Sequence, residues 1–158
     1  MANGPEPGID NGYLADHVEL LRRSLQHWTG RDLVASDLVP PEAARQVYEA
    51  PFVVLSHSPG ADPVLTYGNR AALALFELSW DELTRMPSRL TAEAPDREER
   101  ARLLARVGTQ GYIDDYAGVR VSRTGRRFRI ARATVWNLLD DGGNHCGQAA
   151  SFAHWQRL

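Results

Sequence analysis

The stretch from residue 111 to residue 155 constrains the fold most strongly, because its pattern is typical of three consecutive antiparallel strands. Its middle part, residues 126–139, is rich in β-branched and aromatic side chains and starts with alternating polar and apolar positions. Turn-forming sequences flank it at residues 123–125 and 141–144, so each end is suited to a hairpin. We expect strands at residues 112–122, 126–139 and 145–155.

Composition places the chain among ordinary globular proteins. Its 158 residues are enough for one domain with its own core, and 43% hydrophobic and 24% charged residues are usual for such a domain. A formal net charge of −2 gives no general attraction to nucleic acids or anionic membranes. The sequence has no apolar stretch of membrane-spanning length, and residues 1–7 do not resemble a signal peptide, so we expect no membrane partner.

Two residue counts narrow the chemistry further. The single cysteine, Cys146, excludes an internal disulfide framework and fits a reducing compartment, which leads us to expect a cytoplasmic protein. The 18 basic residues are all arginines. Without lysine, the chain lacks the amine needed for a Schiff base, for a phosphate-binding loop or for a lysine general base.

The N-terminal part is expected to be a tail followed by a helix. Residues 1–12 hold Gly, Pro and Asn without periodicity and predict a mobile tail. Apolar residues then recur at alternating steps of four and three and predict one helix that ends near Gly30: Leu14, Val18, Leu21, Leu25 and Trp28. This seam either packs on the domain's own sheet or pairs with the same helix of a second chain, as a coiled-coil stripe does. The second interpretation predicts a homodimer.

The middle of the chain predicts a series of short elements. We expect a linker at residues 31–40, a helix at 41–48, strands at 52–57 and 62–67, a helix at 70–76, a short helix from residue 79 and a longer helix at 96–107. Asn69 is a candidate N-cap for the helix that follows it. Ser79 with Glu82, and Asp96 with Glu99, stand at the spacing of a capping box.

The order of these elements resembles that of a PAS domain, in which five antiparallel strands hold a ligand on a concave face beneath helices. Residues 48–57, 67–73, 111–116, 135–138 and 147–150 make the resemblance more specific. They read YEAPFVVLSH, YGNRAAL, GYIDDY, VWNL and GQAA. These segments resemble the MEKHLA domain, a PAS-related module that occurs as small bacterial proteins and at the C-terminus of plant class III homeodomain–leucine zipper proteins.

The resemblance spans residues 14–155 and is to the small stand-alone bacterial type. It implies an α+β fold, with a PAS-like five-stranded antiparallel sheet, short helices over one face and an N-terminal helical extension. The expected division is a mobile tail at 1–12, the helical extension at 13–50 and the PAS-like (MEKHLA) domain at 51–158. The implied role is sensory or ligand-binding, and the family brings no agreed catalytic residues.

Two cofactors of PAS domains lack matching residues in this chain. Flavin-binding photoreceptor domains of this kind carry a reactive cysteine in an Asn-Cys-Arg-Phe-Leu-Gln motif on a helix, whereas Cys146 stands beside a predicted hairpin. Oxygen-sensing haem domains of this kind use a histidine on the long helix, and residues 96–107 contain none. The resemblance supports neither cofactor and leaves the cofactor unknown.

The alternation of side chains predicts a pocket on the three-strand meander. A turn at residues 123–126 pairs Val121 with Phe128 and Ile113 with Trp136, so alternate residues share one face. This face gains polar groups and then a tryptophan beside a row of small side chains, which leaves volume for a ligand or for a packed helix. The predicted ligand-binding residues, roofed by helices 70–76 and 96–107, are Asp115, Arg132, Thr134, Trp136 and Ser151.

Asp115 and Arg132 carry the chemistry of this predicted pocket. Their charges suit a hydrogen-bonded pair that orients a polar ligand. One interpretation is a salt bridge that closes the end of the pocket. The other is a carboxylate ligand held by Arg132, with Trp136 as a wall.

A second group, His57, His145 and Cys146, predicts a metal site. The first and last strands of a PAS-like sheet are antiparallel neighbours, which would bring these side chains together around zinc or copper. Their spacing is no recognised metal signature, and adjacent residues on a strand point to opposite faces. Solvated histidines and an unreactive cysteine are the alternative.

Arginines crowd one hairpin, at Arg120, Arg123, Arg126, Arg127 and Arg129. No aromatic residues interleave with them to stack bases, and charges on an exposed edge also prevent edge-to-edge association. We therefore expect no nucleic-acid partner.

Two functions follow from these patterns. The leading expectation is a stand-alone PAS-like module that binds a small molecule and signals through protein association, since the chain ends at Leu158 without an output domain. The alternative is a small enzyme that uses the PAS cavity as an active site, with Asp115, Arg132 or the histidines in acid–base or metal-dependent roles. The sequence shows no nucleophile–base pair, so enzymatic activity stays an open question.

Overall fold

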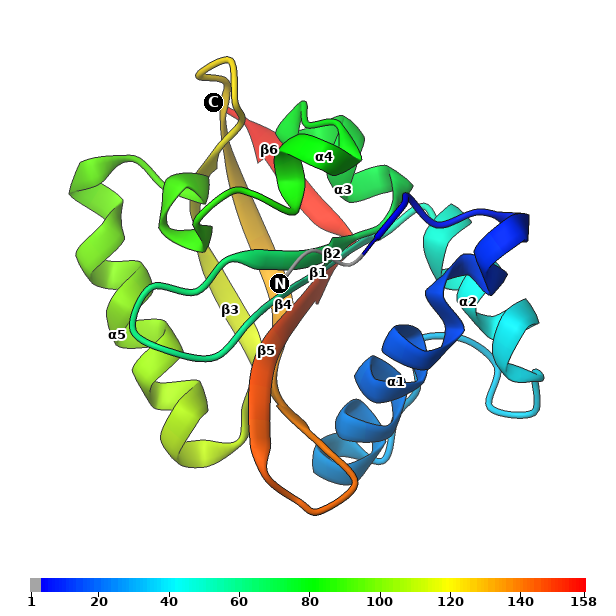
Figure 1. The fold of residues 1–158 in the computed structure, drawn as a ribbon. Helices are drawn as coiled ribbons and strands as arrows, with labels where there is room; N and C mark the ends of the chain where they lie inside the picture. Colours follow the sequence, from blue (N-terminus) through cyan, green and yellow to red (C-terminus); the bar gives the residue numbers. More distant parts are fainter. Residues whose placement is uncertain (1–3) are drawn as a thin grey trace.

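The computed structural model describes residues 4–158, apart from the side chains of residues 94 and 95. It confirms an α+β fold built on one antiparallel sheet (Figure 1). The strands are β1 Val53–His57, β2 Leu65–Gly68, β3 Tyr112–Val121, β4 Arg127–Leu139, β5 His145–Phe152 and β6 His154–Arg157. Their order across the sheet is β2-β1-β5-β4-β3, with β6 also paired to β4. β1 and β5 are antiparallel neighbours, as the PAS-like order predicts.

The sixth strand arises because the predicted strand 145–155 is interrupted at Ala153. β6 continues beyond this break along the same neighbour, β4. The pairs Thr134–Ser151 and Ala131–His154 keep one register on the two sides of the break. Arg132, on β4 at the same level, has a φ of 54°. Both neighbouring strands are therefore distorted at one point of the sheet.

One face of the sheet is covered by α3 Arg70–Phe76, α4 Trp80–Leu83, the 3-10 helix η2 Ser88–Thr91 and α5 Ala94–Gln110. The Asn69 side chain caps α3 by accepting from Ala72 N at 3.1 Å, and Ser79 with Glu82 forms the predicted capping box. The predicted box at residues 96–99 is wrong, because α5 begins two residues earlier and carries a proline in its first turn. We call the buried residues of this face the α5-side core.

The other face is covered by the 3-10 helix η1 Ile9–Leu14, α1 Ala15–Thr29 and α2 Pro40–Glu49, and Figure 1 shows α1 and α5 on opposite sides of the sheet. The apolar seam of α1 is buried here: Val18 and Leu21 are 0% exposed. Trp136 Nε1 donates to Leu21 O at 3.2 Å, and Trp28 Nε1 donates to Asn137 O at 3.0 Å. The seam therefore packs on the chain's own sheet, where Val18, Leu21 and Leu25 are buried. We call this face the α1-side core.

The predicted linker and part of the predicted tail are anchored to this layer. Asp32 accepts two hydrogen bonds from Arg22 of α1, each 2.9 Å long. Trp80 Nε1 donates to Gly4 O at 3.0 Å, and the Tyr48 hydroxyl donates to the Glu6 carboxylate. These contacts differ from the expectation of a mobile tail, of which residues 1–3 lie outside the described part.

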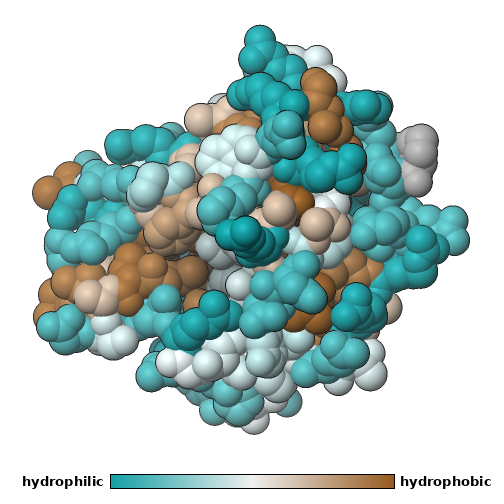
Figure 2. All heavy atoms as spheres, turned by 180° about the vertical axis from the view of Figure 1, so that it is seen from behind, coloured by the Kyte–Doolittle hydropathy of each residue, from teal (hydrophilic) through white to brown (hydrophobic). Residues whose placement is uncertain are grey.

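Within residues 4–158, no helix combines the length and the apolar character needed to cross a membrane. Seen from behind, the surface is mostly hydrophilic, with separate hydrophobic patches (Figure 2). The large apolar side chains that are exposed come from several elements: Ile9, Val39, Leu90, Trp155 and Leu158.

Candidate functional site

A cavity of about 70 Å³ lies between α5 and the sheet. Strands β1 to β5 and helices α3, η2 and α5 all contribute to its wall. The wall is mainly apolar and continuous with the α5-side core: Leu55, Leu65, Phe76, Leu103, Ile130, Val135 and Phe152. The cavity therefore lies within the α5-side core.

A kink in β4 decides which of its residues face this cavity. Phe128 and Ile130 pack in the α5-side core, and beyond Arg132 it is Ala133 and Val135 that do so. Side chains on a regular strand alternate, so this set requires a shift by one residue. The φ of 54° at Arg132 provides the shift. Residues before and after the kink thus belong to one wall although their numbers differ in parity.

On β3, three alternate residues stand on the cavity side. Tyr116 and Arg120 line the cavity, and the Tyr116 ring lies over Gly118, where any side chain would overlap it. The Arg120 guanidinium is 5.3 Å from the centroid of the Tyr116 ring, in a cation–π arrangement. Tyr116 Oη donates to Glu99 of α5 at 3.0 Å. These contacts tie β3 to α5 beside the cavity.

Arg100 of α5 and Arg120 of β3 are buried at the cavity, with exposed fractions of 8% and 7%. Arg100 donates to Ser88 Oγ, and Arg120 Nη1 donates to Val119 O at 2.9 Å. Among the described residues, no carboxylate lies within the 4.0 Å of an ion pair from either guanidinium. Burial and the charge of Arg120 lower the pKa of Arg100 to about 10, which leaves it positive at neutral pH.

Two hydrogen-bond acceptors at the cavity also lack partners within the described chain. Gln148 Nε2 donates to Leu104 O at 3.2 Å and to Asn137 Oδ1 at 3.0 Å, which fixes the amide and leaves Oε1 unpaired. His57 Nδ1 lies 2.9 Å from Ser58 O, so Nδ1 carries the proton and the unpaired Nε2 is an acceptor. Burial lowers the pKa of His57 and keeps its ring neutral.

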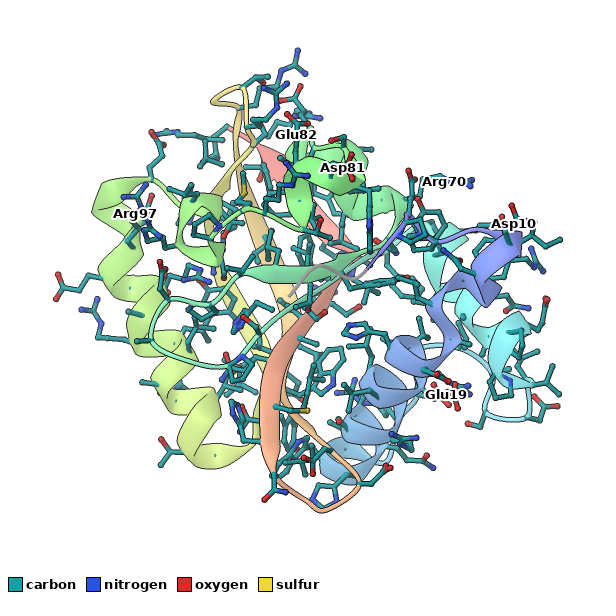
Figure 3. The ribbon with its side chains drawn as sticks, in the orientation of Figure 1. Asp10, Glu19, Arg70, Asp81, Glu82 and Arg97 are labelled. Atoms are coloured by element: carbon teal, nitrogen blue, oxygen red, sulfur yellow. The ribbon has the colours of Figure 1, made fainter. Side chains whose placement is uncertain are left out.

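A more open groove adjoins the cavity and shares Arg100, His57 and Gln148 with its wall. Its other charged or titratable residues are Asp62, Arg89, Arg97 and His145. Asp62 pairs with Arg89 at 2.9 Å, and Arg97 projects from the N-terminal part of α5 (Figure 3). The remaining excess of positive charge favours the approach of anions to this side of the cavity.

The predicted pairing of β3 with β4 is wrong by one residue along most of the hairpin. Val121 pairs with Arg127, and Ile113 pairs with Val135. The turn between the strands is one residue shorter than the sequence reasoning assumed, and the kink at Arg132 reverses the alternation once more. The predicted pocket face therefore mixed residues from both faces of the sheet.

The five predicted pocket residues accordingly lie outside the cavity wall. Thr134 pairs with Ser151 on the α1 side, where Trp136 is fully buried. Asp115 is exposed in a surface groove, and Arg132 is exposed at the kink. No hydrogen bond or ion pair joins Asp115 to Arg132 in the described part of the chain.

The predicted zinc or copper site is not assembled either. His57 and His145 line the same groove, but Cys146 packs in the α1-side core. In residues 4–158 no group of three or more His, Cys, Asp or Glu side chains could hold a metal ion. The reason is the alternation of a strand, since His145 and Cys146 are adjacent and face opposite sides of the sheet.

Sequence reasoning missed Arg100 and Arg120 as cavity residues. Arg100 precedes Leu103 and Val107 by three and seven positions, so it shares their inward face of α5, and this signal was available. The sequence places Arg120 in a cluster of arginines that predicts an exposed edge. Its burial depends on the register of β3, which the sequence does not determine on its own.

Solved structures with this architecture include PAS domains. The PAS domain of a protein from Colwellia psychrerythraea has a TM-score of 0.60 and 12% identity, and the match covers 74% of this chain and 94% of that domain. An RNA-binding Light-Oxygen-Voltage receptor has a TM-score of 0.61 and 18% identity, over 80% of this chain and 34% of the receptor chain. At these identities the likeness shows the fold alone, and it confirms the PAS-like prediction.

The cavity does not fit the flavin of Light-Oxygen-Voltage domains. Its volume of about 70 Å³ is far below the roughly 300–1,000 Å³ of common small-molecule sites. Cys146, the single cysteine, packs on the opposite face of the sheet, so no thiol of this chain reaches the cavity. The described residues therefore do not support a flavin adduct.

Residues 15–157 match the MEKHLA domain. Homeobox-leucine zipper protein ATHB-14 of Arabidopsis thaliana is 32% identical over 143 residues, which is 87% of this chain and 17% of the relative. Homeobox-leucine zipper protein HOX32 of Oryza sativa subsp. japonica is 27% identical over 135 residues, 84% of this chain and 16% of the relative. The chain thus spans less than a fifth of the length of these plant proteins. Because the match extends over nearly all of its sequence, the chain belongs to the MEKHLA domain family.

Proposed function

We propose that this MEKHLA domain is a sensory module that binds a small molecule in the cavity between α5 and the sheet. The observation that carries the proposal is the combination of an internal cavity with buried polar groups that find no partner in the described chain. Unsatisfied polar groups cost about 1–3 kcal/mol each, so a ligand that pairs with them gains affinity. The PAS-type fold supports this location.

The second half of the proposal is that ligand occupancy is passed on through association with another protein. α5 and β3 meet at the cavity through the Tyr116–Glu99 contact, so a ligand there bears directly on the position of α5. The predicted homodimer remains part of this proposal, but it needs a surface other than the buried part of the α1 seam, Val18, Leu21 and Leu25. The expectation of a small stand-alone protein also stays a prediction, because the plant relatives carry similar segments within longer chains.

Filling the cavity tests the binding half. Ala150→Leu places extra carbon atoms in the cavity wall, whereas Ala117→Leu adds the same atoms at an exposed site on β3. Native mass spectrometry of the purified chain, followed by a thermal-shift screen of small molecules, should reveal ligands that bind the wild type and Ala117→Leu but not Ala150→Leu. Equal binding by all three proteins, or by none, would contradict the proposal.

Light scattering with and without a bound ligand tests the association half. A ligand-dependent change in molar mass, or in affinity for a captured partner, is expected. A monomer under every condition would contradict the predicted homodimer.

A further inference from the structure

We infer that the ligand of this cavity is a short hydroxycarboxylate, with its carboxylate held by Arg100 and Arg120 and its hydroxyl donating to Gln148 Oε1 or His57 Nε2. This inference rests on the proposed binding function and adds the chemical class of the ligand. It draws on three features of the cavity: its unpaired cations, its unpaired acceptors and its small apolar volume.

The two arginines require a negative partner. Burying a guanidinium removes its hydration, and the chain normally offsets this with a carboxylate. Arg100 donates to Ser88 Oγ, whereas Arg120 donates to Val119 O and also lies against Tyr116; none of these partners carries a charge at neutral pH. Arg100 and Arg120 both belong to the wall of the same small cavity, and the charge of Arg120 adds to burial in lowering the pKa of Arg100. A carboxylate between them would form charge-assisted hydrogen bonds to both.

The two acceptors require a donor on the same ligand. Gln148 is 6% exposed, and its amide cannot rotate without losing the bonds from Nε2. His57 lines the same cavity as Arg100 and Arg120. A carboxylate alone offers no proton to these atoms, whereas one hydroxyl a few bonds away donates its proton to one of them.

The walls and the volume limit the rest of the ligand. Most of the lining is aliphatic or aromatic. An inorganic phosphate has no carbon atoms to pack against this apolar part of the wall, which would lose those van der Waals contacts. A cavity of about 70 Å³ holds only a few non-hydrogen atoms beyond the carboxylate. A short carbon chain fits both conditions, and the basic groove at Arg89 and Arg97 supplies the side from which an anion would approach.

Calorimetric titration of the full chain tests the class with lactate and 3-hydroxybutyrate as probes. Butyrate lacks only the hydroxyl of the second probe, 3-hydroxybutyramide lacks only its charge, and inorganic phosphate lacks the carbon chain. We expect the hydroxycarboxylates to bind, butyrate to bind about tenfold more weakly and the amide about 100-fold more weakly, as typical hydrogen-bond energies require.

Arg100→Met and Arg120→Met should each lower the affinity for the hydroxycarboxylates on the order of 10- to 100-fold. The matched control is Arg102→Met, because Arg102 stands on the same helix but is 66% exposed and paired with Glu98. Far-UV circular dichroism confirms that each variant is folded. If a variant does not fold, the corresponding Gln variant, Arg100→Gln or Arg120→Gln, replaces it.

Several results would overturn the inference. If 3-hydroxybutyrate and its amide bind with equal affinity, or if Arg102→Met loses as much affinity as the other two variants, the proposed anion site is wrong. Equal affinity for butyrate and 3-hydroxybutyrate would contradict the proposed contact to the hydroxyl. Binding of phosphate but of no carboxylate would mean that the site binds an inorganic anion. If only neutral molecules bind and Ala150→Leu blocks them, the proposed function stands and the ligand class fails; if nothing binds, both fail.

Discussion

Each helical layer of this domain buries arginine side chains against the sheet, but the two layers satisfy them differently. On the α1 side, Arg22 is 6% exposed and lies between Asp32 and Glu19, at 2.9 and 2.6 Å. On the α5 side, Arg100 and Arg120 are as deeply buried and have uncharged oxygen acceptors instead of a carboxylate within the described residues. Glu19 and Arg97, labelled in Figure 3, mark the two sides.

The pKa values of these groups follow the same division. The hydrogen bond to Asp32 raises the pKa of Arg22, and burial alone would raise the pKa of Asp32, but the Arg22 hydrogen bond and charge lower it. The pKa of Arg100 is lowered instead, by burial and by Arg120. The α1 side thus contains a complete buried ion pair, and the α5 side contains two buried cations beside the cavity in which we propose that a ligand binds.

The largest expected effect comes from breaking the complete pair. Arg22→Met leaves Asp32, whose side chain is 10% exposed, without its partner. We expect the free energy of unfolding to fall by about 3–5 kcal/mol, as for other broken buried pairs. Urea denaturation measures it. Arg100→Met removes an unpaired charge, and we expect it to leave the stability unchanged or to raise it.

The double variant Arg22→Met, Asp32→Leu is the control for this comparison. It removes both charges, so most of the lost stability should return. If Arg22→Met and Arg100→Met cost the same, the two arginines are not in different electrostatic situations, and the contrast between the layers is wrong.

The second prediction concerns pH and the α1 side. Burial lowers the pKa of His17 from 6.5 to about 4, while its Nε2 lies 2.9 Å from Ser56 Oγ and its ring stacks on Tyr67. Between these two pH values the unfolded chain binds the proton and the folded chain does not. The contribution of His17 to the free energy of unfolding should therefore be constant above pH 6.5. It should fall by up to about 3 kcal/mol as the pH drops towards 4.

Denaturation curves at several pH values measure this dependence. His17→Gln removes the titrating group and should flatten the curve in that window. His27→Gln, on the exposed side of the same helix, is the matched control and should keep the slope of the wild type. A flat wild-type curve would mean that His17 is solvated in the folded protein.

The sequence predicted the two layers unequally. The α1 seam, the Asn69 cap and the element order were predicted because each depends on local spacing and capping chemistry. The cavity wall was not, because it depends on the β3–β4 register and on the kink at Arg132, where a non-glycine residue has positive φ. The pairing of strands that are distant in sequence sets both the register and the kink, and no local sequence pattern around Arg132 predicts either of them.

The third prediction sharpens the description of the α5 side. Gly118→Ala places a methyl group where the Tyr116 ring lies, so the ring must shift from its position against Arg120. We expect a loss of about 1–3 kcal/mol, the usual cost of overpacking a filled site. Gly108→Ala is the control with the opposite sign, because nothing lies within 4 Å of its added methyl group and helix α5 gains about 0.5–1 kcal/mol. Thermal unfolding distinguishes the two. A neutral Gly118→Ala would mean that the Tyr116 ring moves freely and does not define the cavity wall.

The smallest expected change in stability tests whether a buried polar atom without a partner is, by itself, evidence of a ligand site. Tyr67 Oη, on the α1 side, is buried without a hydrogen-bond partner in the described chain, yet Tyr67 is not among the residues that line the cavity. Its ring packs against His17 and Trp80, at centroid distances of 5.6 and 6.0 Å.

Tyr67→Phe removes this hydroxyl, and we expect the stability to stay the same or rise by up to about 1 kcal/mol, because no hydrogen bond is lost. Tyr48→Phe, which removes the hydroxyl bonded to Glu6, should instead cost about 1 kcal/mol. Urea denaturation of both variants gives the comparison. A clear loss in Tyr67→Phe would show that an ordered water pairs with the hydroxyl. The unpaired atoms on the α5 side would then need the same test with Gln148→Met before a ligand is assigned to them. If Tyr67→Phe is neutral, an unpaired atom marks a ligand site only where a cavity adjoins it, as it does at Gln148 and His57.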